Sequence, residues 1–181
     1  MKTKPLLILL ICAITILFVS CDDSDKIDTV WKEANEAIFA EMSTHPDYSK
    51  IYAKSEMGYI LYKELQSGNG ETPIFTDSVE VLYIGWYKKD WTKEDTYTND
   101  KGNKVRNKII FDQSPRNGEL PTHLKVSDLI DGFATALQHM QEGDRWEVWI
   151  PWRLGYGATD YGNIPAYTTL VFEIELRKVI R

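Results

Sequence analysis

The residue types that most often carry acid/base, nucleophilic or metal chemistry are sparse in this chain. The histidines, His45, His123 and His139, are scattered without the short spacing of metal ligands. No serine has a histidine and an aspartate placed in a hydrolase motif. Glu173 and Glu175 lie on one side of a predicted strand, where a solvated face explains them better than acid/base machinery. The sequence therefore predicts no metal and no cofactor.

Aromatic rings and one carboxylate offer a different chemistry, the binding of an apolar group in a pocket. Taken alone, several rings are typical of a hydrophobic core: Tyr83, Phe111, Phe133 and Phe172. Asp112 alone is typical of a turn or of the surface, although it directly follows an aromatic ring in Phe-Asp-x-Ser. Tyr156 stands between two glycines, which by itself indicates a tyrosine in a loop. The local sequence pattern therefore does not decide whether these residues belong to the hydrophobic core or to a binding site.

The N-terminus predicts export. Lys2 and Lys4 precede an apolar run of fourteen residues, Leu6 to Val19, whereas a helix that spans a membrane needs about 20. Residues 1–20 are therefore predicted to be a signal peptide. The segment Phe18-Val19-Ser20-Cys21 resembles a lipobox, with Phe18 where leucine is common, and this resemblance implies cleavage before Cys21 and lipid on its sulfur.

The mature chain is then expected in the bacterial cell envelope, anchored to a membrane by lipid. The preferred location is the outer membrane, on the face toward the periplasm or on the outer surface. Residues 21–27 are acidic and lack apolar spacing, which is typical of a tether. Cys12 leaves with the signal peptide, so no disulfide is expected. The formal net charge of −6 argues against a nucleic-acid partner.

Residues 28–56 are predicted to contain a helix of about four turns, capped by Asp28 and ended before Pro46. Its apolar side chains follow one helical stripe: Val30, Trp31, Ala34, Ile38 and Met42. This stripe either packs on the following domain, which we prefer, or forms a dimerisation face.

Residues 57–181 are predicted to be one β-rich domain. Strands are expected at 57–65, 79–85, 108–111, 124–126, 145–150 and 170–176, with one short helix between Asp131 and Gly143. Alternation places Trp146 inward and Trp149 outward as an exposed ring, and residues 88–108 form an exposed loop or an extended hairpin. The fold class is α+β, an antiparallel sheet wrapped around one short helix and preceded by the N-terminal helix.

Six segments, taken in order, resemble one family, the FKBP-type peptidyl-prolyl isomerases. They are Val81-Leu82-Tyr83-Ile84-Gly85, Phe111-Asp112-Gln113-Ser114, Leu129-Ile130-Asp131-Gly132-Phe133, Met140 to Arg145, Ile150-Pro151 with Leu154-Gly155-Tyr156-Gly157, and Ile164-Pro165 before Thr169 to Leu176. The resemblance extends over residues 57–181 and implies the FKBP-like fold.

The same resemblance implies a site. Tyr83, Asp112, Ile130 and Tyr156 would be the catalytic residues, and Phe111, Phe133, Ile164 and Phe172 would line the proline pocket. Ile130 would donate its N–H to a substrate carbonyl, and the Tyr156 hydroxyl would donate to the carbonyl that precedes proline. Phe133 stands where the family more often has tryptophan, and Thr122 and Leu124 stand where it usually has aromatic residues at the pocket rim.

An apolar pocket suits this reaction. The barrier of about 18–20 kcal/mol to rotation about an X-Pro bond comes from conjugation of the amide. The reaction therefore makes and breaks no covalent bond. Holding the twisted amide in a dry cavity lowers that barrier.

The expected function is isomerisation of proline-containing polypeptides to assist the folding of exported proteins. An alternative is a weakly active or inactive binding or chaperone module of an envelope complex. A purely structural lipoprotein would leave the predicted pocket residues unexplained.

Overall fold

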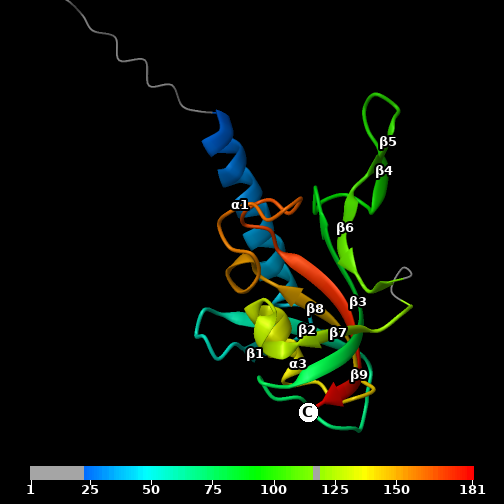
Figure 1. Ribbon diagram of the computed structural model, residues 1–181. Coiled ribbons are helices and arrows are strands. Elements are labelled where there is room, and N and C mark those ends of the chain that lie inside the picture. Colours follow the sequence, from blue (N-terminus) through cyan, green and yellow to red (C-terminus); the bar gives the residue numbers. More distant parts are fainter. Residues whose placement is uncertain (1–22, 116–118) are drawn as a thin grey trace, which may run out of the picture.

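The computed structural model describes residues 23–115 and 119–181 (Figure 1). Its helices are α1 (Asp23–Met42) and α3 (Asp131–Leu137), with short 3₁₀ turns η1 (Val126–Asp128) and η2 (Trp152–Leu154). The strands are β1 (Ser49–Tyr52), β2 (Tyr59–Gln66), β3 (Ser78–Lys88), β4 (Thr96–Thr98), β5 (Lys104–Arg106), β6 (Lys108–Gln113), β7 (Thr122–Lys125), β8 (Arg145–Ile150) and β9 (Leu170–Ile180). The predicted fold class is confirmed.

One antiparallel sheet runs in the order β1-β2-β8-β9-β3-β6, and β7 pairs with β3 beside β6. Strand β3 is shared along its length. Its first part, Ser78 to Val81, pairs with β7, and its last part, Ile84 to Lys88, pairs with β6. The ladder on this side of β3 is therefore interrupted at Leu82 and Tyr83, and Tyr83 is one of the residues predicted for the site.

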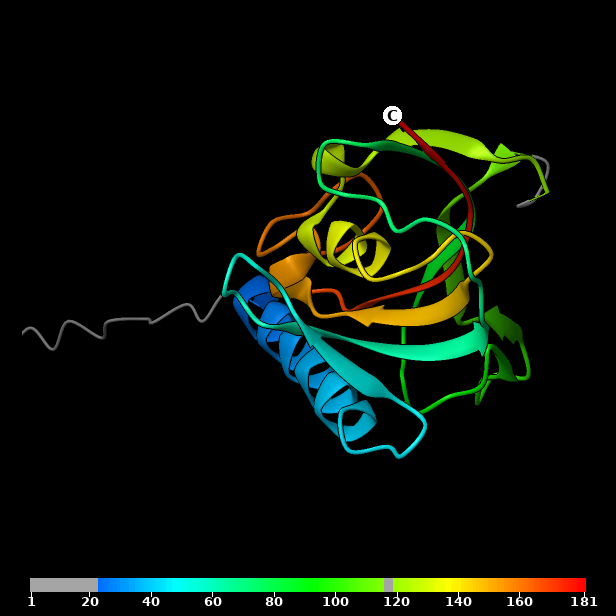
Figure 2. The ribbon, with the colours of Figure 1, turned by 90° about the horizontal axis from the view of Figure 1, so that it is seen from below.

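The sheet has a helix on each face. Figure 2 shows α3 above the curved sheet and α1 beneath it. Side chains of α3 and of the inner face of the sheet form the main core, which contains Phe133, Leu137, Val148 and Phe172. On the outer face, Phe39 of α1 packs in a second cluster with buried Leu61, Trp149 and Val171.

These two faces explain why several strands have continuous apolar runs. Neighbouring residues such as Leu170, Val171 and Phe172 are all buried, although they point alternately to opposite faces. Trp149 does point away from the inner core, as predicted, but the expectation that it is exposed was wrong. Only 6% of its surface is accessible, because Trp91, Tyr48 and α1 cover the outer face.

Helix α1 begins at Asp23 instead of Asp28, so most of the segment predicted as a tether is helical. Its face toward the domain contains Trp31, Asn35 and Phe39, spaced by four residues, with Ile38 and Met42 beside them. The predicted stripe is thus partly wrong. Val30 and Ala34 are exposed, and buried Asn35 takes a position that an apolar pattern does not reveal.

The predicted signal peptide and Cys21 lie outside the described residues. Within residues 23–115 and 119–181, no helix is long and apolar enough to cross a membrane.

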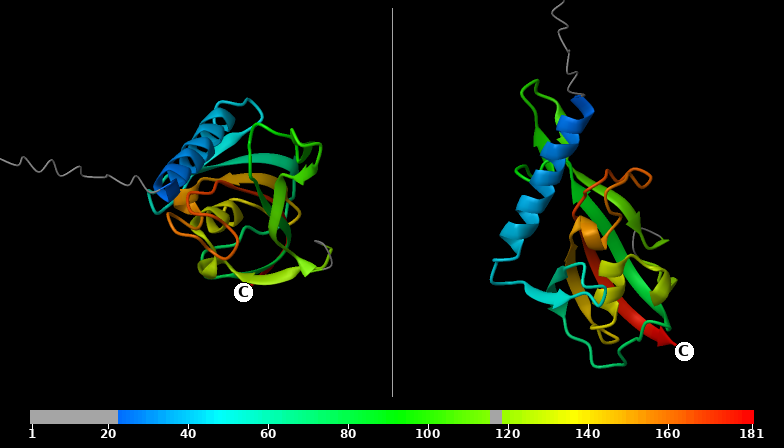
Figure 3. Two further views of the ribbon diagram at one scale, coloured as in Figure 1. Left: turned by 90° about the horizontal axis from the view of Figure 1, so that it is seen from above. Right: turned by 90° about the vertical axis from the view of Figure 1, so that its left-hand side faces the viewer.

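Two further features complete the description of the strands. Strand β1 was not predicted, and residues 96–106 form the β4–β5 hairpin, which was one of the two alternatives for residues 88–108. This hairpin and the first turns of α1 project from the same end of the domain (Figures 1 and 3).

Candidate functional site

A hollow of about 180 Å³ lies between α3, β3, β6, β7 and the segment that follows η2. All four residues predicted for catalysis line it, Tyr83, Asp112, Ile130 and Tyr156, together with the predicted pocket residues Phe133 and Phe172. Its other lining residues are Leu124, Asp128, Leu129 and Tyr161. Segments spread over about half of the chain therefore meet at one place.

Phe133 forms the apolar floor of the hollow. Its ring is perpendicular to that of Phe172, with centroids 5.1 Å apart, and nearly perpendicular to that of Tyr83, at 5.8 Å. Edge-to-face pairs of this kind each contribute about 0.5–1.5 kcal/mol beyond the burial of their surface. The rings are thereby fixed in one arrangement.

Phe111 and Ile164, the other two predicted pocket residues, pack close to the hollow's surroundings. Phe111 packs edge-on against Phe172 at 5.4 Å, and Ile164 is buried in the main core. Neither belongs to the lining of the hollow in this structure, so they support the rings that do.

Gly85 is required by the approach of two rings to the backbone of β3. A Cβ atom at this position would lie 2.5 Å from Cε1 of Phe172 and 2.8 Å from Cζ of Phe111. Such distances are too short for real contacts, so only glycine lets both rings cross here.

The Tyr83 hydroxyl donates a hydrogen bond of 2.8 Å to Oδ2 of Asp112. The other carboxylate oxygen, Oδ1, accepts from the N–H of Gln113 at 2.9 Å. Both contacts fix the orientation of the Asp112 carboxylate at the wall of the hollow.

Ser114 explains the last position of the Phe-Asp-x-Ser motif. Its fully buried hydroxyl accepts from the Tyr83 N–H at 3.0 Å and donates to the Val81 carbonyl at 3.2 Å, while the Ser114 N–H donates to the Tyr83 carbonyl at 2.9 Å. Thr122 adds a donor at 3.3 Å. Ser114 therefore closes the interrupted ladder beside Tyr83 and holds the end of β6 in place.

Burial raises the pKa of the Tyr83 hydroxyl, and the hydrogen bond to Asp112 raises it further. The pKa of Tyr156 is also raised, first by burial and then by the nearby Tyr161 and Asp112. Both hydroxyls are consequently protonated, and available as donors, throughout the neutral range.

Ile130 precedes α3 and caps it in an extended conformation, with φ −56° and ψ 146°. Its carbonyl accepts the N–H of Ala134, the first bond of the helix. Within the described part of the chain, no acceptor takes the amide proton of Ile130. A backbone donor is thus available at the edge of the hollow.

Tyr161 was missed by the sequence reasoning. Its ring stacks on that of Tyr156, with centroids 4.2 Å apart and an angle of 8° between the planes. Tyr161 is 61% exposed and lies in a segment without periodicity, so no sequence signal marks it. Leu124 does line the hollow at the predicted rim, whereas Thr122 bonds to Ser114 instead.

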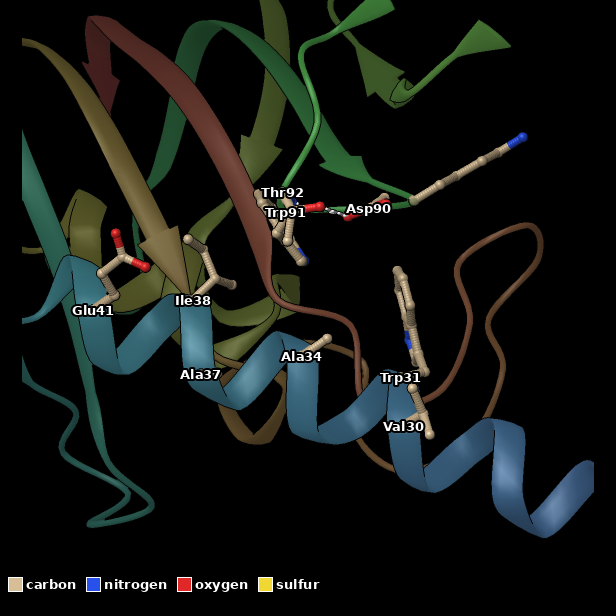
Figure 4. A pocket seen from close by; sticks show the side chains of 10 residues that line it. Val30, Trp31, Ala34, Ala37, Ile38, Glu41, Asp90, Trp91 and Thr92 are labelled. Atoms are coloured by element: carbon tan, nitrogen blue, oxygen red, sulfur yellow. Dashed lines mark hydrogen bonds between the residues drawn. The ribbon is translucent and has the colours of Figure 1, made fainter. Parts of the chain in front are cut away.

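A larger groove, of about 910 Å³, lies between α1 and the chain that follows β3. Figure 4 shows Val30, Ala34 and Ile38 on the helix side, with Trp91 reaching toward the helix from the other side. None of the residues predicted for the site lines this groove.

Comparisons with known proteins identify relatives. A model of the FKBP-type peptidyl-prolyl cis-trans isomerase family matches residues 70–177. The FKBP-type 22 kDa peptidyl-prolyl cis-trans isomerase of Escherichia coli is 30% identical over 159 residues, which cover 86% of this chain and 68% of that protein. A macrophage infectivity potentiator of Trypanosoma cruzi is 28% identical, with 91% and 79% covered.

Among solved structures, a peptidyl-prolyl cis-trans isomerase from Pseudomonas syringae is similar with a TM-score of 0.63 and 30% identity. The similarity covers 84% of this chain and 96% of that one.

Proposed function

Because the chain belongs to the family of FKBP-type peptidyl-prolyl cis-trans isomerases, we propose that it isomerises X-Pro bonds in the hollow floored by Phe133. The observation that carries this assignment is the convergence of Tyr83, Asp112, Ile130 and Tyr156 around one apolar floor. The substrates are proline-containing polypeptides.

In this proposal the proline ring lies on Phe133, between the rings of Tyr83 and Phe172. Perpendicular aromatic walls exclude water from the ring and hold it, while the residue before proline turns about the amide bond. In a dry site the polar planar amide loses more solvation than the less conjugated twisted amide. The free-energy difference between the two forms, and therefore the barrier to rotation, is then smaller than in water.

Polar groups at the rim orient the two sides of the bond. The Ile130 N–H would donate to a substrate carbonyl, and the Tyr156 hydroxyl would donate to the carbonyl that precedes proline. The Asp112 carboxylate, fixed by Tyr83 and Gln113, would lie beside the reacting amide and polarise it.

Binding at this hollow can be tested by nuclear magnetic resonance. Titration of the ¹⁵N-labelled chain with a short X-Pro peptide should move the Ile130 amide downfield, and should move the Phe133 and Phe172 resonances. The matched peptide with alanine in place of proline should cause smaller shifts. Shifts confined to the groove beside α1 would contradict the assignment and favour a binding module.

We also propose that Cys21 carries lipid and anchors the mature chain in the bacterial cell envelope, where it assists the folding of exported proteins. Support comes from the charged and apolar leader and from Phe18-Val19-Ser20-Cys21. Several acyl chains together anchor a protein firmly, whereas one binds only marginally. Mass spectrometry of the N-terminal peptide from native membranes tests this: an unmodified Cys21 would refute the anchor.

A further inference from the structure

The segment from Pro151 to Thr169 carries Tyr156, Tyr161 and Ile164 but has little regular structure of its own. It contains the single turn η2 and one isolated bridge between Tyr161 and Ile164. Hydrogen bonds inside the segment join its parts, such as the Tyr167 N–H to the Gly157 carbonyl at 2.9 Å and the Ala166 N–H to Oδ1 of Asp160 at 2.8 Å. Contacts from outside then fix where the segment lies relative to the rest of the domain.

Helix α1 lies against this segment (Figures 2 and 3). The Trp31 indole N–H donates to the Ala166 carbonyl at 2.9 Å, and the Trp152 indole N–H donates to Oε1 of Glu36 at 3.0 Å. The Lys32 ammonium lies over the Trp152 and Tyr167 rings, at 5.7 and 5.2 Å from their centroids. These contacts join positions near both ends of the segment to one helix.

Asn35 is the fully buried centre of this junction. Its Oδ1 accepts from the Thr169 N–H at 2.9 Å and from the Trp91 indole N–H at 3.1 Å, and its Nδ2 donates to the Trp31 carbonyl at 2.9 Å. The Thr169 hydroxyl donates to the Asn35 carbonyl at 3.0 Å. A buried amide whose oxygen and nitrogen are both hydrogen-bonded favours one arrangement of the parts that it joins.

The junction continues to Ile164. The Trp31 ring packs edge-on against Tyr87 at 6.2 Å, and the Tyr87 hydroxyl donates to the Asn163 carbonyl at 2.9 Å. Hydrogen bonds from Tyr87 and Trp31 thus hold the carbonyls of Asn163 and Ala166, on either side of Ile164 and Pro165. The Tyr87 ring also stacks on Phe111, which supports the pocket aromatic Phe172.

From these contacts we propose that Trp31 and Asn35 are positioning residues for the isomerase reaction. They hold the segment 151–169 in the conformation that presents Tyr156 to the hollow and keeps Ile164 beneath it. This role rests on the proposed site, because it acts through Tyr156 and Ile164 and touches no substrate.

A positioning role has a kinetic signature. If the segment is in the competent conformation only part of the time, apparent affinity falls by that fraction, while the rate within the complete complex is unchanged. KM then rises at constant kcat. Partial unfolding of the whole chain gives the opposite pattern, because it removes active molecules and lowers the apparent kcat at constant KM.

The test uses the full-length chain with Trp31→Phe, which removes the indole donor and keeps a ring, and with Asn35→Ala, which removes the buried amide. Val30→Ala is the matched control, because Val30 is on the same helix and 61% exposed. Line-shape nuclear magnetic resonance on an X-Pro peptide yields KM and kcat separately, and hydrogen exchange reports on the amides of residues 151–169.

We expect KM to rise by about three- to tenfold in Trp31→Phe and Asn35→Ala, with kcat unchanged and faster exchange in the segment. Val30→Ala should match the wild type. Unchanged KM in a folded Trp31→Phe variant would overturn the proposal even if Asn35→Ala fails to fold. Tyr156→Phe distinguishes failure of the positioning role from failure of the proposed site. If Tyr156→Phe changes the kinetics and Trp31→Phe does not, only the positioning role is refuted. If Tyr156→Phe leaves the kinetics unchanged, the proposed site is refuted.

Discussion

The hydroxyl of Tyr83 and the carboxylate of Asp112 are joined by a 2.8 Å hydrogen bond across the interrupted ladder between β3 and β6. One residue comes from the middle of a strand and the other from the end of its neighbour. The bond orients the carboxylate of Asp112 at the wall of the hollow.

Tyr83→Phe should lower kcat/KM by about tenfold, because it removes a charge-assisted hydrogen bond and frees the carboxylate to turn. The ring contacts with Phe133 and Phe172 remain, so the chain should stay folded. A protease-coupled or nuclear magnetic resonance assay on an X-Pro peptide measures this effect. Tyr52→Phe is the control, since Tyr52 is 71% exposed and outside the site. Equal losses in both variants would contradict a specific role for Tyr83.

Ser114→Ala should lower the free energy of unfolding by about 1–3 kcal/mol, because the buried N–H of Tyr83 loses its acceptor. Urea unfolding followed by tryptophan fluorescence gives the value. Ser67→Ala, at an exposed position, should change it little. A Ser114→Ala variant as stable as the wild type would show that the hydroxyl does not hold β3 and β6 together.

Gly85→Ala should lower the free energy of unfolding by about 1–3 kcal/mol, and activity with it, since the added methyl group displaces the Phe172 and Phe111 rings. Adding Phe172→Leu removes the nearer ring atom. In a double-mutant cycle the second change should therefore restore part of the lost stability, after its own cost is subtracted. Strictly additive losses would mean that the rings do not lie against Gly85.

Activity should be independent of pH from about pH 6 to about pH 9, because burial raises the pKa of both Tyr83 and Tyr156 above the ordinary value near 10. The neutral hydroxyls stabilise the folded chain fully below that ordinary value. This stabilisation is lost as pH rises through the higher folded-state pKa values, so stability declines only in the alkaline range. An inflection of kcat/KM near neutral pH would contradict the use of these hydroxyls as donors.

Sequence patterns predicted most of the sheet because its strands alternate or form short apolar runs. The same patterns could not show Trp149 buried, since its cover comes from α1 and Trp91, distant along the chain. They missed Asn35 because a helical stripe is recognised by apolar residues, whereas this position is buried through hydrogen bonds.

The site required the family resemblance as well as the pattern. Phe133 and Phe172 look like core residues from sequence, and in the structure they are both core and the wall of the hollow. Tyr161 reaches the site only through its stack on Tyr156, which a loop sequence does not specify. Ile164 and Phe111 are predicted pocket residues that do not line the hollow in this structure; Phe111 packs against the lining residue Phe172, and Ile164 is buried in the main core.

The central claim is that isomerisation takes place at the hollow lined by Tyr83, Asp112, Phe133 and Tyr156. It is tested most directly by cis-to-trans isomerisation of a short X-Pro peptide by the full-length chain, compared with Asp112→Ala, Tyr156→Phe and the exposed control Tyr52→Phe. We predict rapid isomerisation by the wild type and the control, with kcat/KM about tenfold lower in each site variant. Isomerisation that is equally fast in Asp112→Ala, Tyr156→Phe and the control would contradict this account.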